Sequence, residues 1–279
     1  MPIAPLPGIV TTAAIFTRDL RFPSAMTRLA AALLLVSAAA GLALGARSLY
    51  ASEPMRVALV AQDAVAIVFG LPLLVLSAWS ARKGSARGLL CWMGALFYLA
   101  YFWFFHVIGV QFGPLLPAHI AIVSIGMYGA LYLFVGLNPE AVKARFSVRL
   151  KARSIAVFLM GTASIFAVAW LVLIVSRARA GVGLDTVTRL VVAVDGVVLL
   201  PLMFFGGLWL WRRQPLGYAL AVMLLVKSVA TFLTLVVTSA VAWSAGGDLV
   251  VLELAAYGTG LVVASLLLFN CLASFEEAP

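Results

Sequence analysis

The sequence predicts an all-α protein, a polytopic bundle of about eight transmembrane helices. Hydrophobic residues make up 65% of the 279 residues and charged residues only 10%, well below the roughly 25% that is typical of soluble domains. Eight apolar stretches each reach the length of about 20 residues that an α-helix needs to cross a bilayer. The connections between them are short, so no soluble domain has room to fold between the helices.

The apolar stretches define the expected spans in order along the chain. They cover residues 29–50, 57–80, 88–110, 115–137, 154–176, 188–211, 216–241 and 249–272. A basic linker, residues 138–153, separates a first four-helix half, residues 28–137, from a second, residues 154–279. Residues 1–27 precede the first span and are too short to form a domain.

The first span has an alternative interpretation. Met26-Thr27-Arg28, the apolar run after it and Ala43-Leu44-Gly45 resemble a signal peptide with a small-residue cleavage site. The apolar run continues to about Tyr50, however, and 25 residues precede Met26, which favours a retained helix. We expect a retained span, and cleavage within residues 1–45 is the alternative.

The linker begins with Asn138-Pro139-Glu140, which is typical of a helix start. Asparagine is a good N-cap, proline suits the first helical position, and an acid is favourable in the first turn. A short basic helix on the inner membrane surface fits this pattern. A solvated positive loop that only sets the topology is the simpler interpretation, and the short helix is the alternative to it.

Lysine and arginine are unevenly divided between the two sides of the membrane. With a cytoplasmic N-terminus, the inner segments hold thirteen of these residues and the outer segments five. Cytoplasmic loops carry such an excess in membrane proteins. The sequence therefore predicts a multi-pass protein with both termini in the cytoplasm.

The positive charge does not indicate nucleic-acid binding, and the cysteines do not indicate a disulfide or a zinc site. A net charge of +9 suggests nucleic-acid binding in a soluble protein, but here the basic residues lie between apolar spans, where membrane topology and anionic head groups explain them. No nucleic-acid partner is expected. Cys91 and Cys271 lack CxxC or Cys/His spacing, so disulfide and zinc sites have no support.

The two halves resemble each other in sequence, with matched residues at similar offsets. The matched pairs are Asp63 and Asp195, Trp79 and Trp211, Gly88 and Gly217, Tyr98 and Lys227, and His119 and Glu253. Because each half has an even number of helices, this predicts a parallel repeat related by an axis along the membrane normal. Chance similarity between apolar sequences is the alternative.

Six ionisable side chains lie within the expected spans, where a charge is expensive and normally faces the bundle interior with a partner. They are Asp63, His106, His119, Asp195, Lys227 and Glu253. With a cytoplasmic N-terminus, five lie in the outer third of the membrane and Lys227 lies near the midplane. We expect Lys227 to face the interior and to approach Asp195 or Asp63 directly or through water.

Two helical faces extend this group. Lys227, Thr231 and Thr234 share one face of the seventh span, which predicts a wet cavity or, alternatively, threonines bonded to carbonyls of their own helix. Tyr98 and His106 share one face of the third span. Packing and lipid contact are the simpler explanation of this aromatic face, and an aromatic wall around an apolar ligand is the alternative.

These residues form the predicted polar site. Its members are Asp63, Tyr98, His106, Asp195, Lys227, Thr231 and Thr234, with His119 and Glu253 at its margin. A purely structural ion pair is the alternative for the Asp and Lys residues, and contact with head groups and water is the alternative for His119 and Glu253. No HxxxH or HExxH spacing supports a metal site, and no cofactor is predicted.

Several motifs also resemble a known group of proteins. They are Asp63 with Gly70-Leu71-Pro72, Asp195 with Pro201, the run Arg212-Arg213-Gln214-Pro215-Leu216-Gly217-Tyr218, and Leu225-Val226-Lys227. Over roughly residues 56–240 the chain resembles a widespread group of uncharacterised bacterial multi-helix membrane proteins. The resemblance implies a bacterial inner-membrane location and carries no known activity, so it assigns no functional residue.

The leading functional hypothesis is a small-solute or proton-coupled transporter or channel, with the bilayer and an ion or small molecule as partners. The first alternative is an accessory, sensory or assembly subunit whose buried charges are structural. The second is an intramembrane enzyme acting on lipid or isoprenoid. The enzyme is disfavoured because no GxSxG nucleophile, phosphate-binding glycine loop or metalloenzyme spacing is present, and no catalytic residue is assigned.

Overall fold

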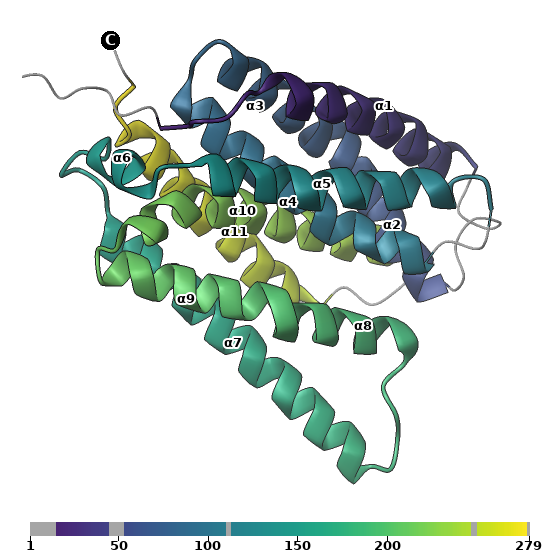
Figure 1. The fold of residues 1–279 in the computed structure, drawn as a ribbon. Coiled ribbons are helices and arrows are strands. Elements are labelled where there is room, and N and C mark those ends of the chain that lie inside the picture. Colours follow the sequence, from purple (N-terminus) through teal and green to yellow (C-terminus); the bar gives the residue numbers. More distant parts are fainter. Residues whose placement is uncertain (1–14, 45–52, 110–112, 247–249, 278–279) are drawn as a thin grey trace, which may run out of the picture.

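The chain folds into a bundle of long helices (Figure 1). The computed structural model describes residues 15–44, 53–109, 113–246 and 250–277. Within these ranges, eight helices are long and apolar enough to cross a membrane. They cover Arg21–Ala43, Met55–Arg82, Ala86–Ile108, Leu116–Gly136, Ala152–Arg179, Thr188–Trp211, Pro215–Ser244 and Val251–Ala273. The predicted all-α bundle of eight helices is confirmed, and it indicates an integral, multi-pass membrane protein.

Two of the eight spans are divided by a wider π-helical turn. The first half contains α1 (Arg21–Ala43), α2 (Glu53–Val65), the π turn η1 (Ala66–Gly70), α3 (Leu71–Arg82), α4 (Ala86–Gly109) and α5 (Leu116–Gly136). The second contains α7 (Ala152–Arg179), α8 (Thr186–Val194), the π turn η2 (Asp195–Leu199), α9 (Leu200–Trp211), α10 (Pro215–Ser244) and α11 (Val251–Ala273). The short helix α6 (Pro139–Ala144) lies between the halves.

The helix starts agree with the sequence at the linker and differ at the first span. The Asn138 side chain accepts a hydrogen bond from the backbone N of Ala141, so the predicted N-cap of α6 is confirmed. α1 begins at Arg21, eight residues before the expected start. The basic residues there interrupt the apolar run but do not interrupt the helix. Gly45 and Tyr50, on which the cleavage alternative depends, lie outside the described residues.

Both π turns have the same local cause. Pro72 and Pro201 each occupy the second position of the helix that follows the π turn. A proline has no N–H to give to the carbonyl four residues earlier, and its ring crowds that carbonyl. A π turn accommodates this mismatch, and such turns often occur at functional sites.

The third helix of each half forms the centre of the molecule. α4 and α10 pack against each other, and they are the most buried of the eight described spans. Around α4 stand α3 and α5, with α1 between them; around α10 stand α9 and α11. The outer helices α7 and α11 are the least buried of the described spans, and Figure 1 shows the C-terminal part of α7 projecting beyond its neighbours.

Backbone hydrogen bonds close the two halves in the same way. In each half, the segment before the first helix pairs with the residues that follow the fourth, as an antiparallel bridge. The bonds join Thr17 N to Gly136 O and Asn138 N to Ile15 O in the first half, and Ser147 N to Ser274 O and Glu276 N to Arg145 O in the second. This equivalence supports the internal repeat, while its rotation axis stays a prediction.

The register of the repeat differs from the one expected around the acids. The π turns begin 129 residues apart, at Ala66 and Asp195, and Gly88 and Gly217 share this offset. Asp195 is therefore equivalent to Ala66, and the predicted pairing of Asp63 with Asp195 is wrong by three residues. Three residues are nearly one helical turn, so both acids still lie on the same face of equivalent helices.

Candidate functional site

Four side chains meet at a small cavity where the two halves join. Tyr101 from α4, Asp195 from η2 and Lys227 from α10 line the cavity, and Trp170 from α7 donates a hydrogen bond to Asp195. This cavity is called the lysine cavity below. The cavity has a volume of about 40 Å³ and is otherwise enclosed mainly by apolar side chains. This is room for little more than ordered water.

Asp195 is held by two hydrogen bonds, one to each carboxylate oxygen. Tyr101 Oη donates to Oδ1 at 2.5 Å, and Trp170 Nε1 donates to Oδ2 at 3.0 Å. The side chain is 5% exposed. Because hydrogen bonds to an ionised group are about twice as strong as neutral ones, these two donors stabilise Asp195 as a buried carboxylate.

Lys227 lies in the middle of α10 and is 1% exposed, so the prediction that it faces the interior is confirmed. Its ammonium lies 3.7 Å from the centre of the Tyr101 ring, a cation–π contact. Asp195 is the acid that acts on it electrostatically. Among the described residues, no carboxylate forms a direct ion pair with Lys227 Nζ.

The Thr231 and Thr234 hydroxyls of α10 form hydrogen bonds within their own helix. Thr231 Oγ1 donates to the carbonyl of Lys227 and Thr234 Oγ1 to that of Ala230, both at 2.8 Å. Thr231 alone of the two lines the lysine cavity. The structure therefore favours the alternative in which these hydroxyls bond within their own helix, rather than a continuous wet stripe.

A second polar group crosses the first half and uses all four of its spans. It contains Ser37 from α1, Asp63 from α2, His106 from α4 and His119 from α5, and is called the histidine chain below. His106 Nε2 lies 3.1 Å from Asp63 Oδ1, and His119 Nε2 lies 2.6 Å from Ser37 Oγ. The two imidazoles meet edge to face, with centroids 5.4 Å apart.

The histidine chain leads from one end of the bundle toward its middle. His119 lies about 5 Å from the start of α5, and Asp63 about 15 Å from the start of α2, at 1.5 Å per residue. Both helices begin at the same end of the bundle. Each of the four side chains is at most 2% exposed, and His119 Nδ1 has no hydrogen-bond partner among the described residues.

The two remaining predicted residues have opposite surroundings. Tyr98 is fully buried against Gly70, and its hydroxyl lacks a partner within the described chain; Asp63 acts on it electrostatically. Glu253 is exposed on α11 and joins neither polar group. The expected equivalence of Glu253 with His119 therefore does not extend to their environments.

The single predicted site is thus two sites. Asp63, His106 and His119 belong to the histidine chain, while Asp195, Lys227 and Thr231 belong to the lysine cavity. Ser37, Tyr101 and Trp170 were not predicted. Aromatic and small hydroxyl residues are common in membrane helices, so only their three-dimensional neighbours distinguish these three.

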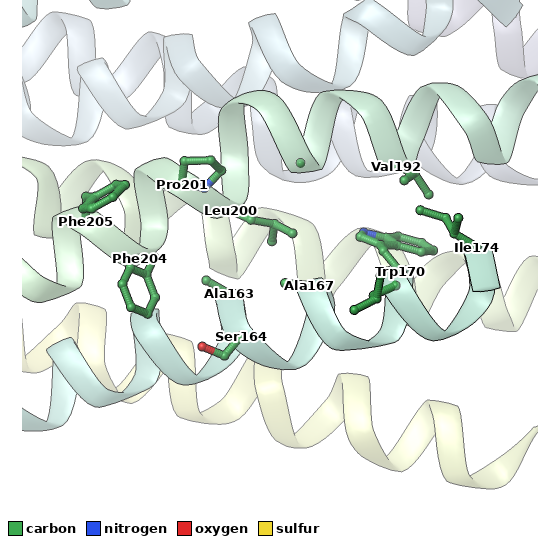
Figure 2. Close-up of a pocket in the computed structure, with 12 residues that line it drawn as sticks. Ala163, Ser164, Ala167, Trp170, Ile174, Val192, Leu200, Pro201, Phe204 and Phe205 are labelled. Atoms are coloured by element: carbon green, nitrogen blue, oxygen red, sulfur yellow. The ribbon is translucent and has the colours of Figure 1, made fainter. Parts of the chain in front are cut away.

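A groove on the outside of the second half lies beside the lysine cavity. It has a volume of about 570 Å³ and runs between α7 and the α8–α9 segment. Figure 2 shows Trp170, Ile174 and Leu200 between these helices. Leu200 also lines the lysine cavity, and Trp170 donates a hydrogen bond to Asp195, so these two side chains lie between the groove and the cavity.

No cluster of three or more His, Cys, Asp or Glu side chains that could hold a metal ion occurs in the part of the chain that the structure describes. Comparisons with protein-family models, with curated proteins and with solved structures found no match. The resemblance to bacterial membrane proteins, the inner-membrane location and the sides of the termini therefore stay predictions.

Proposed function

We propose that this protein is a proton-coupled membrane transporter in which the histidine chain binds and releases the proton. The observation that carries the proposal is the burial of Asp63, His106 and His119 as a connected group that begins near one membrane surface. Ionisable residues inside a membrane are expensive, and chains of Asp and His serve as proton relays in pumps and transporters.

The geometry supports a proton shared between His106 and Asp63. His106 Nδ1 lies 3.5 Å from the carbonyl of Phe102 in its own helix, which leaves Nε2 facing Asp63. One proton between imidazole and carboxylate keeps the pair close to neutral, which lowers the cost of burial. His119, nearer the surface, exchanges that proton with the exterior when its ring reorients.

The π turns supply a point at which the spans can bend. η1 begins three residues after Asp63, and η2 begins at Asp195 itself. Transporters place their binding sites at interrupted helices near the middle of the membrane, where two structural repeats meet. Bending at these turns would connect the proton site to the opposite side.

Proton flux in reconstituted liposomes tests the proposal. Purified protein is placed in vesicles with an entrapped pH dye, and a potassium diffusion potential drives protons inward. We expect flux with the wild type and a loss of at least about tenfold in Asp63→Asn and His106→Phe. Glu253→Gln is the matched control, because Glu253 is also an ionisable residue of a span but is exposed. Equal flux in all four proteins, or no flux in the wild type, would contradict the proposal.

A second candidate is a membrane subunit that assembles with another protein. The low burial of α7 and α11 favours it, because these helices leave broad apolar surfaces that no described residue of the chain covers. In that case His106→Phe would leave assembly intact, whereas a bulky substitution at exposed Ile165 of α7 would disrupt it. Size-exclusion chromatography of the purified complex separates the two outcomes.

A further inference from the structure

The lysine cavity contains a buried cation, Lys227, that no carboxylate of the described residues contacts directly. Lys227 is 1% exposed, and its ammonium faces the Tyr101 ring rather than a carboxylate. Asp195, the acid that acts electrostatically on Lys227, accepts one hydrogen bond at each carboxylate oxygen. An ammonium in this setting has unused hydrogen-bonding capacity, and a ligand with a negative group would satisfy it.

The route to this cation runs from the lipid. The groove between α7 and α9 is apolar, open to the membrane side of the bundle, and within the range of small-molecule pockets. Trp170 lines the groove (Figure 2). The Trp170 indole also donates a hydrogen bond to Asp195. Leu200 lines both the groove and the lysine cavity, so displacement of the Trp170 and Leu200 side chains would join the two spaces.

We propose that this combined site binds a long-chain carboxylic acid, with its alkyl chain in the groove and its carboxylate on Lys227. Charge complementarity selects the head group and the apolar groove selects the tail. The acid arrives from the lipid in its neutral form and passes its proton to Asp195 Oδ2, which Trp170 has released. The carboxylate then pairs with the Lys227 ammonium, so the net charge of the buried site does not change.

The inference rests on the proposed function only in treating the acid as cargo; binding itself does not require the histidine chain. An Asp63→Asn protein should therefore bind the acid as well as the wild type does. Acid binding without proton flux would support the acid site and contradict the proton-coupled function. Proton flux without acid binding would support the proton-coupled function and contradict the acid site.

Quenching of tryptophan fluorescence in detergent tests the site. The probe is a dibrominated stearic acid, because bromine quenches nearby indoles, and its methyl ester is the matched ligand without a charge. We expect the acid to bind at least about tenfold more tightly than the ester, as a charge-assisted hydrogen bond allows. The quenching that Trp170→Phe removes identifies binding in the groove.

Three substitutions separate head-group recognition from chain recognition. Lys227→Met should reduce the acid to the affinity of the ester. Ser164→Phe fills the groove and should weaken both ligands, whereas Ile165→Phe, at the next exposed position of α7 and outside the groove, should weaken neither. If the Lys227→Met protein does not fold, the comparison of Ser164→Phe with Ile165→Phe still tests whether the ligand binds in the groove. Equal binding of acid and ester by the wild type, or an unaffected Ser164→Phe protein, would overturn the inference.

Discussion

Tyr101 contacts both charged groups of the lysine cavity. Its hydroxyl donates to Asp195, and the face of its ring lies under the Lys227 ammonium. A phenylalanine at this position would keep the ring and remove only the hydrogen bond. The two roles can therefore be measured separately.

Tyr101→Phe should lower the free energy of unfolding by about 1.5–3 kcal/mol, the range for a hydrogen bond to a charged group. Unfolding of the purified protein in mixed micelles measures this change. Tyr132→Phe is the control, since its hydroxyl donates to the carbonyl of Asp19 at an exposed position, and it should cost about 1 kcal/mol or less. Equal losses in both variants would show that Asp195 needs no donor from Tyr101.

At the scale of helices, glycines near the turns between spans allow neighbouring helices to pack closely. Gly217 is the third residue of α10 and lies against the end of α9: a Cβ at this position would come within 2.2 Å of the Leu210 backbone N. Gly88, its equivalent in the repeat, would place a Cβ within 2.7 Å of the Ala81 backbone N. Backbone atoms cannot move aside as a flexible side chain can.

Gly217→Ala should therefore destabilise the protein by about 1–3 kcal/mol or more, the cost of overpacking. Gly161→Ala is the matched control, because this glycine lies within α7 with no heavy atom within 4 Å of its added Cβ. There alanine should stabilise the helix by about 0.5–1 kcal/mol. Denaturation curves of both variants give the two signs, and a neutral Gly217→Ala would contradict the close approach.

Across the whole molecule, the C-terminal segment fastens the second half to the first. The Glu277 carboxylate accepts hydrogen bonds from Ser85 Oγ at 2.6 Å and from the backbone N of Ala86 and Arg87, both at 3.0 Å. These groups form the start of α4, where a negative charge is favourable. Arg87 in turn donates to the carbonyl of Phe275.

This contact should depend on pH. Burial by itself raises the pKa of Glu277, but the hydrogen bonds and the Arg87 charge outweigh it and lower the pKa below its ordinary value. A carboxyl with a lowered folded-state pKa contributes stability above its unfolded pKa of about 4.3, and this contribution is lost as the pH falls through the folded-state value.

Glu277→Gln should therefore reduce stability by about 1 kcal/mol or less at neutral pH, because the group is only half-buried and solvent screens its charge. The difference from the wild type should vanish in acid. Thermal unfolding at a series of pH values measures it, and Glu276→Gln is the control, since its side chain is exposed on the neighbouring residue. A difference that persists at low pH would exclude the carboxylate as its cause.

The topology of the whole chain is also testable. The excess of lysine and arginine on one side predicts that both termini are cytoplasmic. A fluorescent reporter fused after Pro279 should fold and fluoresce in the cytoplasm. Activity of a periplasm-specific reporter at the same position, or a mature N-terminus near Arg47, would remove the eight-span arrangement.

Among these features, the sequence alone determined the number of spans and the start of α6. Both depend on local properties: the length of an apolar run, and an N-cap followed by proline. The burial of Lys227 was also predictable, because a lysine in the middle of an apolar helix has few other favourable positions.

Only the tertiary structure decided which partners the buried charges have. Lys227 lies beside Asp195 and Tyr101, while Asp63 lies beside His106, because α10 packs between the halves and the first half closes around its own acid. No spacing within one helix determines which residue of another helix it meets. The three-residue shift between Asp63 and Asp195 has the same origin: the prolines position the π turns, and the turns set the register in which equivalent helices face their neighbours.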